Sequence, residues 1–209
     1  MSKTKEHIDP RVIRTRQLLR DALIALILEQ GFEALTVKDI TDRATLNKAT
    51  FYLHYKDTDD LLIQSTAELQ EELIETIGQP MITEENLTST LLELLTLVFE
   101  HFARYKDFYD VVLNKIGTPP VIAAIQNPIE TMGKRTIERL HNSEAGIDQD
   151  LIVRFTSSAC IGLIQRWLAT KAERSPEYMA EQCLNLLVYG IHYTLRHMTQ
   201  TEKDTQPND

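Results

Sequence analysis

The feature that most constrains this chain is a pair of helix-start signals that follow each other closely near the N-terminus. Thr36 is followed three residues later by Asp39, and this is the spacing of a capping box, in which side chains and backbone bond reciprocally. Asn47 is a second residue of the type that caps helices, and an apolar residue precedes each cap. The pattern therefore predicts two short helices, over residues 37–44 and 48–55, joined by a two-residue turn.

A longer helix is predicted before these two. Apolar residues recur at helical spacing over residues 11–30, Gly31 then supplies a residue that ends helices readily, and Phe32 can fold back onto Ile27. After the two short helices, Asp57 caps a fourth helix. Two short helices joined by a tight turn and packed on a longer one form a helix-turn-helix unit.

The second short helix of such a unit lies in the DNA major groove, with its first residues at the base edges. Lys48 can donate to guanine, while Ala49 and the methyl group of Thr50 can contact the thymine methyl. Thr36, at a helix start, suits a phosphate contact, and basic residues supply sequence-independent attraction. The candidate DNA-contacting residues are Arg14, Arg16, Thr36, Lys38, Lys48, Ala49, Thr50, Tyr52, His54 and Lys56.

Packing is the alternative role for the aromatic residues of this helix. We assign Tyr52 to a phosphate contact rather than to the core, and His54 to a DNA contact rather than to a solvated surface. Phe51 and Leu53 are expected in the core.

The charge of the chain is unevenly distributed. Residues 1–56 carry ten Lys and Arg against seven Asp and Glu, whereas residues 57–209 carry twelve against 24. The overall net charge of −9 therefore conceals a basic N-terminal part, which is typical of a nucleic-acid-binding module on a separate acidic one.

The stretch from Arg14 to Leu62 resembles the DNA-binding domain of TetR/AcrR-family transcriptional regulators. The matching residues are Thr15-Arg16, Gly31-Phe32, Leu35-Thr36, Ile40, Ala44, Thr50 to Lys56 and Leu61-Leu62. The resemblance implies phosphate contacts by Thr36 and Tyr52. It also implies base or phosphate contacts by Lys38, Lys48, Thr50 and His54.

Two positions depart from the family pattern. The turn between the short helices usually holds Gly in this family, and Thr45 stands there instead, although a β-branched residue with positive φ is an outlier. Thr58 replaces a Lys that commonly binds phosphate in the family. We expect weaker DNA affinity and a flatter dependence on salt from the second departure.

The rest of the chain is predicted to be helical almost throughout. The expected fold is all-α, with about nine helices: an N-terminal three-helix helix-turn-helix domain over residues 10–56 and a C-terminal helical bundle for ligand binding and dimerisation over residues 57–198. Residues 199–209 form a polar tail that we expect to be disordered. The helices expected after the fourth cover residues 84–106, 107–116, 120–141 (broken or kinked near Pro128), 148–173 and 176–198.

The last two of these helices carry little charge and several small residues. They form either an internal helix pair or, as the family resemblance implies, a four-helix interface with a second chain, which a palindromic DNA operator also requires. We favour the homodimer. The candidate interface residues are Ser158, Gly162, Leu186, Leu187, Gly190 and Ile191.

Aromatic residues gather in the middle of the C-terminal part. They are either core or the lining of an apolar pocket for a small molecule, and the family resemblance implies such a pocket. The candidate pocket residues are Phe99, Phe102, Tyr105, Phe108, Tyr109, Cys160 and Trp167. This part also resembles, in fewer residues, the C-terminal domains of dihydroxyacetone-kinase regulators, through Gly162-Leu163-Ile164, Trp167-Leu168 and Ser175-Pro176-Glu177.

No enzyme class fits the residue patterns. The chain holds no Gly-rich phosphate loop, nucleophile elbow or zinc-type cysteine pair, and no two of its six His have a metal-binding spacing on one helix. We therefore expect no catalytic residue, metal or cofactor. The sequence also lacks an apolar run of spanning length and a secretory signal, so a cytoplasmic location is expected, in which Cys160 and Cys183 stay reduced.

These observations favour a DNA-binding transcriptional regulator. We expect a homodimeric repressor that a small-molecule effector releases from a palindromic operator. The alternative is a protein that keeps this fold, has lost specific operator binding, and acts through a protein partner.

Overall fold

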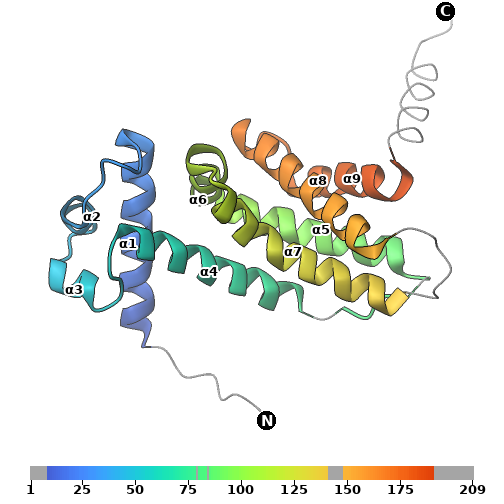
Figure 1. The fold of residues 1–209 in the computed structure, drawn as a ribbon, viewed down its shortest axis with the longest axis horizontal. Helices are drawn as coiled ribbons and strands as arrows, with labels where there is room; N and C mark the ends of the chain where they lie inside the picture. The colour runs from blue at the N-terminus through green and yellow to red at the C-terminus, as the bar shows by residue number, and fades with distance from the viewer. Residues whose placement is uncertain (1–8, 79, 84, 141–147, 191–209) are drawn as a thin grey trace, which may run out of the picture. The chain divides into compact units, whose positions relative to one another are not determined.

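The computed structural model describes residues 9–78, 80–83, 85–140 and 148–190. Within these ranges the regular elements are nine α-helices and two π-helical segments, without a strand (Figure 1). The all-α fold expected from the sequence is thereby confirmed. Contacts divide the chain into an N-terminal unit that ends at Glu71 and a C-terminal unit that begins at Glu72.

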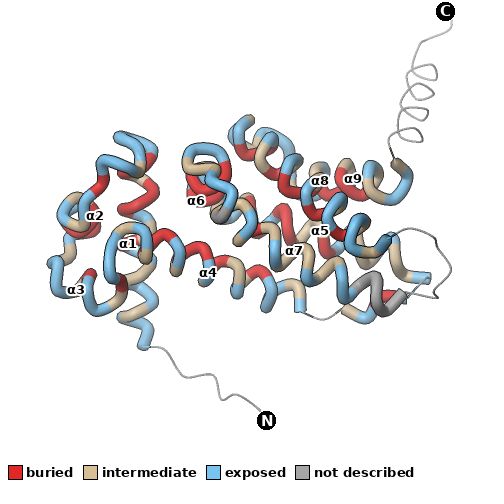
Figure 2. The backbone as a smooth tube through the Cα atoms, in the orientation of Figure 1, coloured by how far each residue is buried: buried red, intermediate tan, exposed pale blue. Residues whose placement is uncertain are grey.

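The N-terminal unit contains α1 (Pro10–Gln30), α2 (Val37–Ala44), α3 (Lys48–Tyr52) and the first part of α4 (Thr58–Ile77). α2 packs against both α1 and α3. Each of these helices has buried segments, drawn in red in Figure 2. The largest fully buried side chains of this unit are Leu19, Leu23, Ile40, Phe51, Tyr55, Leu61 and Leu69.

The ends of these helices are fixed by the local bonds that the sequence predicted. The Asp39 amide donates to Thr36 Oγ1 at 3.3 Å, and the Thr36 amide donates to the Asp39 carboxylate at 3.0 Å, which completes the capping box. The Thr50 amide donates to Asn47 Oδ1 at 2.7 Å. Helix α1 ends at Gln30, and its C-cap residue Gly31 has a φ of 83°.

The prediction that the second short helix continues to Tyr55 is wrong, because α3 ends at Tyr52. The carbonyl oxygen of Phe51 accepts from the amides of both His54 and Tyr55, each at 2.9 Å. This double acceptance tightens the chain into a turn. The turn allows the Tyr55 side chain to enter the core, where it is 2% exposed.

Thr45 adopts the left-handed conformation, with φ 56° and ψ 42°. Its amide donates to the Asp42 carbonyl at 3.2 Å, and the next amide, of Leu46, donates to the Thr41 carbonyl at 2.9 Å. These bonds end α2 and reverse the chain toward α3. A β-branched residue in this conformation is strained, as expected from the sequence for a threonine at this turn.

The C-terminal unit continues with α5 (Leu87–Arg104), α6 (Lys106–Asp110), the π-helical segment η1 (Val111–Ile116), α7 (Pro119–Leu140), α8 (Gln149–Ala169), α9 (Pro176–Leu184) and the π-helical segment η2 (Asn185–Tyr189). Within this unit α5 packs along α9, and α7 packs along α8. Helix α6 and η1 both contact α8. The unit is therefore a bundle.

Three expected helices of this unit differ in the structure. The helix expected over 107–116 becomes α6 and η1, because the hydrogen-bond spacing widens, as in the bond from the Gly117 amide to the Val112 carbonyl at 3.1 Å. Helix α7 is continuous through Pro128, so of the expected break or kink the break is wrong, and the kink stays a prediction. The last helix begins at Pro176 after its Ser175 cap, as predicted, but gives way to η2 after Leu184.

Three earlier predictions fall outside the described residues. They are the interface role of Ile191, the end of the last helix at residue 198, and the disordered tail at 199–209.

Candidate functional site

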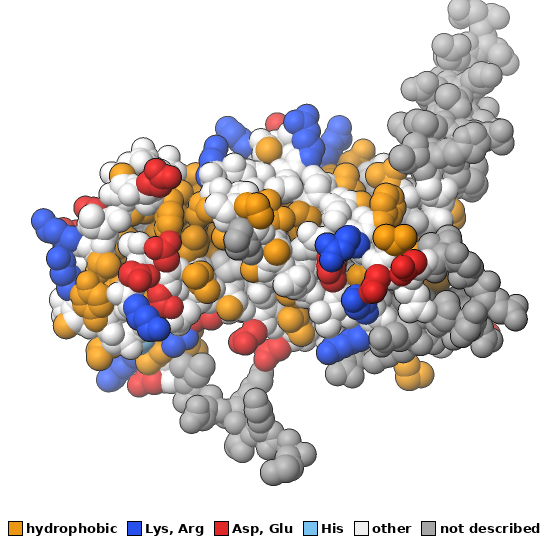
Figure 3. Space-filling view, viewed as in Figure 1, with side chains coloured by type: hydrophobic (Ala, Val, Ile, Leu, Met, Phe, Trp, Pro, Cys, Tyr) orange, Lys and Arg blue, Asp and Glu red, His pale blue; other side chains and the backbone are white. Residues whose placement is uncertain are grey.

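The exposed side of α3 is the first candidate site. Lys48, Ala49 and Tyr52 are all exposed, and Tyr52 retains 59% of its accessible surface. Phe51, on the opposite side, is fully buried and meets the Tyr52 ring edge-on with centroids 5.6 Å apart. Phe51 thus holds α3 on the unit while its neighbours face outward. At the α2–α3 edge, Figure 3 shows Lys and Arg side chains in blue.

The two threonines predicted to contact DNA already have hydrogen-bond partners. The Thr36 hydroxyl donates to the Asp39 carboxylate at 2.6 Å, and the Thr50 hydroxyl donates to Asn47 Oδ1 at 3.0 Å. The hydrogen bonds from Thr36 hold the pKa of the Asp39 carboxyl below its usual value, so a negative charge stands beside Thr36. A phosphate that binds at Thr36 must compete with this carboxylate.

The predicted basic contacts fall into two groups. Arg14, Lys38 and Lys56 are exposed, as the electrostatic role requires. Arg16 is half-buried, and its guanidinium donates to the Glu68 carboxylate at 2.6 Å. This pair links α1 to α4 within the N-terminal unit. The Glu68 carboxylate also offsets the positive charge of Arg16, which was predicted to attract DNA.

His54 and Leu53 occupy the turn that follows α3. His54 is half-buried, and its pKa is lowered first by burial and then by the nearby Arg16. Leu53 is 80% exposed, so the expectation that it lies in the core is wrong. Leu53 keeps right-handed helical dihedral angles, and its amide donates to the Ala49 carbonyl at 3.1 Å. Its side chain therefore follows that of the exposed Ala49 on the outward side of α3.

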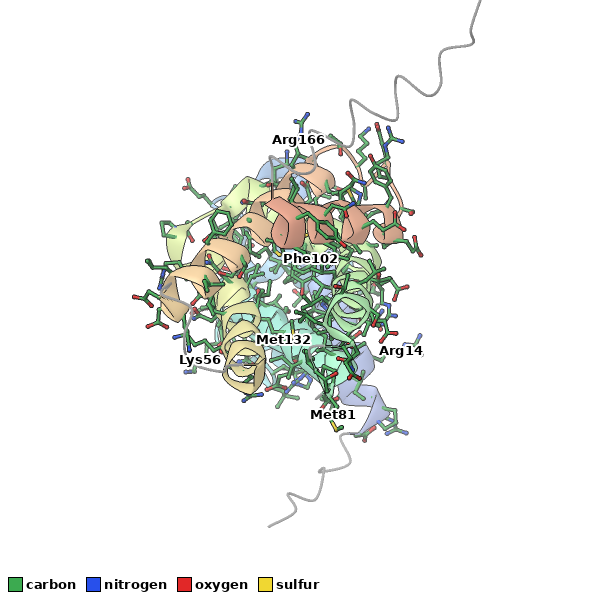
Figure 4. The ribbon with its side chains drawn as sticks, turned by 90° about the vertical axis from the view of Figure 1, so that its right-hand side faces the viewer. Arg14, Lys56, Met81, Phe102, Met132 and Arg166 are labelled. Carbon is green, nitrogen blue, oxygen red and sulfur yellow. The ribbon has the colours of Figure 1, made fainter. Side chains whose placement is uncertain are left out.

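A cavity of about 250 Å³ in the C-terminal unit is the second candidate site. It lies among α5, α7, α8 and η2, and none of its lining residues carries a charge. Figure 4 looks into this bundle, with Met132 marking the α7 side. The hydroxyl hydrogen of Thr156 is donated to the Ile152 carbonyl at 2.9 Å, and that of Ser157 to the Arg154 carbonyl at 3.1 Å. The cavity therefore suits an uncharged, largely apolar group.

Of the seven residues predicted to line a pocket, Cys160 alone lines this cavity. Phe99, Phe102, Phe108, Tyr109 and Trp167 are buried side chains that pack on one another, for example Phe99 and Trp167 with centroids 5.4 Å apart. Tyr105 is half-buried, and its hydroxyl donates to the Glu72 carboxylate at 2.6 Å. The structure thus places these six in the core or at its edge.

Of the cavity-lining residues that sequence reasoning missed, the largest group forms one face of α5, and the others lie on α7, α8 and η2. The apolar residues on α5 recur three or four positions apart. This spacing predicts a buried helix face, and such a face can either pack in the core or line a cavity. The cavity-lining residues of α5 are Leu87, Leu91, Leu94, Leu95 and Val98.

One face of α8 carries exposed apolar and small residues. Leu151 and Phe155 retain 63% and 68% of their surface, and Ser158 and Gly162 follow on the same face and are also exposed. A methyl group added at Gly162 would meet no atom within 4 Å. Of the other predicted interface residues, Leu186 is exposed, Leu187 is half-buried on the cavity wall, and Gly190 is half-buried.

The end of α4 is bonded to α5 within the C-terminal unit. Glu72 accepts from the Tyr105 hydroxyl at 2.6 Å and from the Arg104 guanidinium at 3.1 Å. Because α5 also lines the cavity, Glu72 connects α4 with a wall of that cavity.

Two family models match the chain. One, described as bacterial regulatory proteins of the tetR family, matches residues 19–64, and the other, described as a transcriptional regulator C-terminal region, matches residues 89–189. The chain belongs to the TetR family of transcriptional regulators. The helix-turn-helix unit that defines the DNA-binding part of this family is the one formed by α2 and α3.

Two curated proteins are similar in sequence. The uncharacterized helix-turn-helix-type regulator YxbF of Bacillus subtilis is 27% identical over 192 residues, which are 88% of this chain and 47% of YxbF. The transposon Tn10 TetC protein of Escherichia coli is 29% identical over 103 residues, 49% of this chain and 50% of TetC. The TetR-family chain thus spans about half the length of these relatives.

Solved structures share the fold. The FadR regulator of Bacillus subtilis in complex with stearoyl-CoA has a TM-score of 0.65 at 18% identity, covering 84% of this chain and 99% of that one. A TetR regulator from Streptococcus agalactiae has a TM-score of 0.61 at 20% identity, covering 85% and 95%. The dihydroxyacetone kinase operon activator DhaS has a TM-score of 0.62 at 18% identity, covering 86% and 97%.

Two further observations concern membrane spans and metal sites. Across the described part of the chain, no helix combines the length and apolar character that a membrane span needs. In the same residues, no three His, Cys, Asp or Glu side chains come together as metal ligands.

Proposed function

We propose that this regulator is a homodimeric repressor that binds a palindromic operator and is released by an apolar small molecule. DNA binding is assigned to residues 10–56, and ligand binding and dimerisation to residues 57–198. The observation that carries the proposal is the outward face of α3, where Lys48, Ala49 and Tyr52 are exposed around the buried Phe51. A short helix held in this way presents its first residues to the base edges of the major groove.

The exposed face of α8 supports the dimer. Phe155 and Leu151 are large apolar side chains in water, and the small residues Ser158 and Gly162 beside them permit close approach of another helix. A second copy that packs on this face would bury both side chains. A two-fold dimer also matches the two-fold symmetry of a palindromic operator.

The cavity supports an effector with an apolar chain. Its lining is uncharged, so a charged head group would remain outside, and its volume of about 250 Å³ suits a single hydrocarbon chain rather than a large ring system. Acyl-CoA is bound in the FadR structures of Bacillus subtilis and Thermus thermophilus, the latter with a TM-score of 0.52. A fatty acyl compound is therefore the effector class we propose.

Helix α4 provides the route from the cavity to DNA. Its residue Glu68 pairs with Arg16 in the N-terminal unit, and its residue Glu72 bonds Tyr105 in the C-terminal unit. An effector that favours a displaced α5 would move the end of α4 and change the separation of the two α3 helices, which must lie about 34–36 Å apart on DNA. Glu72→Gln is expected to weaken this coupling while effector binding itself persists.

The test begins with the selection of bound sequences from a random DNA pool. We expect a palindrome that the chain binds specifically at about 50 mM salt, and Lys48→Ala should weaken binding about 5- to 150-fold. Lys106→Ala, an exposed lysine of the C-terminal unit, is the matched control and should leave binding unchanged. Fluorescence anisotropy measures both. If no sequence is enriched, the alternative of a regulator that acts through a protein partner is supported, and the strained Thr45 is the feature that would favour it.

The effector class is tested with fatty acyl compounds of increasing chain length. Affinity should rise about fourfold with each methylene group until the cavity is full, because each buried methylene contributes about 0.8 kcal/mol. Met132→Trp fills the cavity and should abolish the dependence on chain length while DNA binding is retained. Affinity that is independent of chain length would contradict this assignment.

A further inference from the structure

We propose that Cys160 and Cys183 form a reactive dithiol at the cavity wall, which an organic hydroperoxide converts into a disulfide between α8 and α9. The two sulfur atoms lie 3.5 Å apart, although the residues are 23 positions apart in sequence. Both cysteines are free and buried. They are also the only cysteines of the chain, so no other thiol competes.

The two thiols differ in their access to the cavity. Cys160 lines the cavity, whereas Cys183 is fully buried and lies behind it against Cys160. A molecule in the cavity therefore meets Cys160 first. The two thiols are in hydrogen-bond contact, in which either sulfur can donate. This contact lowers the pKa of Cys160 and, together with burial, raises the pKa of Cys183. This asymmetry makes Cys160 the nucleophile and Cys183 the resolving thiol.

The cavity lining selects the class of oxidant. Because none of the lining residues is charged, a hydroperoxide on an apolar carbon skeleton enters at lower cost than a polar or charged oxidant. Such a molecule belongs to the same apolar class as the effector proposed above. The proposed oxidation takes place in the same cavity and does not depend on DNA binding.

The reaction balances in two steps. The Cys160 sulfur attacks the terminal peroxide oxygen, the O–O bond breaks, and the alcohol leaves with the proton, so that Cys160 becomes a sulfenic acid. The Cys183 sulfur then attacks the Cys160 sulfur, the S–O bond breaks, and water leaves with the Cys183 proton. One hydroperoxide is reduced and two thiols are oxidised. The sulfur atoms must approach to about 2.05 Å, which small side-chain and helix adjustments provide.

The disulfide would act on η2, which borders both the cavity and the exposed surface that we assign to the dimer interface. Cys183 lies near the end of α9, directly before η2, and η2 supplies Leu187 and Val188 to the cavity wall and Leu186 to the exposed surface. Oxidation would fix this part of α9 to α8. It would thereby restrict how the cavity can widen for an effector.

The test counts thiols in the full-length chain and needs no DNA. Reduced protein is treated with equimolar cumene hydroperoxide, unfolded with excess N-ethylmaleimide, and weighed by intact-mass spectrometry. We expect the label count to fall from two to zero without a covalent dimer, and dithiothreitol to restore it. A folded chain that keeps both labels under conditions that oxidise the urea-unfolded chain would overturn the proposal, as would a disulfide between two chains.

Variants test the order of attack. In Cys183→Ser, dimedone should trap one sulfenic acid, at Cys160. In Cys160→Ser, oxidation of Cys183 should be about tenfold slower, because its thiol lies behind the cavity wall. Equal rates in the two variants would contradict the assignment. Met132→Trp keeps both thiols and blocks the cavity, so it should slow oxidation by cumene hydroperoxide even if a serine variant fails to fold. Because the readout is thiol chemistry, a failure of DNA binding leaves this result intact.

Discussion

The two units of this regulator place their candidate sites in opposite environments. In the N-terminal unit the site is a surface, where Lys48, Ala49 and Tyr52 project outward from a helix held by one buried ring. In the C-terminal unit the site is a cavity with uncharged walls. Base recognition needs particular donors at particular positions, whereas an apolar cavity needs only volume between packed helices. The first kind of site is specified residue by residue, and the second by the packing of a whole unit.

The sharpest test of this comparison removes the ring that holds α3. Phe51→Ala should destabilise the N-terminal unit by about 3–5 kcal/mol, because it deletes a fully buried aromatic side chain. Hydrogen exchange measured by segment should show loss of protection in α1 to α3 and unchanged protection in α5 to α9. Tyr52→Ala, at the neighbouring exposed residue, is the control and should change stability by less than about 0.5 kcal/mol. Equal loss of protection in both units would break the comparison.

The next test addresses the exposed face of α8, which we propose as the dimer interface of the C-terminal unit. Phe155→Glu places a charge in the proposed α8 interface and should weaken dimerisation by at least about 2 kcal/mol. Sedimentation should then give a monomer near 24.0 kDa at concentrations where the unaltered chain is a dimer. Glu177→Gln, an exposed change on α9, is the control. A variant that remains dimeric would show that this face is not the interface.

Each unit contains a buried titratable group whose pKa is strongly shifted, so the stabilities of the two units should depend on pH in different ranges. Burial lowers the pKa of His101 from 6.5 to about 4, so the stability that this neutral ring contributes is present above pH 6.5 and is lost as the pH falls toward 4. Burial raises the pKa of Tyr55 from 10.0 to about 12, so its contribution is present below pH 10 and is lost as the pH rises toward 12.

Segment-resolved hydrogen exchange should therefore show that α5 and α6 lose protection at acid pH, whereas α1 to α3 lose protection at alkaline pH. Tyr55→Phe should remove part of the alkaline loss, and His101→Gln should remove part of the acid loss. If the alkaline loss is the same in Tyr55→Phe, the burial of this hydroxyl does not govern it.

The smallest expected effect concerns the turn between α2 and α3. Thr45→Gly relieves a left-handed β-branched residue and should stabilise the N-terminal unit by up to about 1 kcal/mol, since the relief exceeds the added freedom of the unfolded chain. Urea unfolding followed by a probe in this unit measures the change. Destabilisation would mean that the turn stores no strain.

The same division explains what could be predicted from the sequence. The caps at Thr36 and Asn47 were predicted correctly, because capping depends on residues three apart. The exposure of Leu53 was missed because, in so short a helix, apolar spacing does not show which side faces the core. The pairing of Arg16 with Glu68, 52 residues away, has no local signal.

In the C-terminal unit most helices were predicted, but of the residues predicted to line a pocket only Cys160 lines the cavity. Leucine spacing on α5 indicates a buried face, but it does not tell whether the neighbouring helices close over that face or leave space. The aromatic residues around Phe99 were predicted to line a pocket because aromatic residues often do so. In the structure their rings pack on one another and fill the space between the helices. Cavities arise from long-range packing, which periodicity does not specify.

Methylation protection on the selected operator tests the central claim most directly, because it detects guanine N7 in the major groove. We predict two protected clusters whose centres lie about 10–10.5 base pairs, or a multiple of that spacing, apart, with both weakened together in Lys48→Ala. A single protected cluster, or a pattern that Lys48→Ala leaves unchanged, would contradict the claim that two copies of α3 contact the operator.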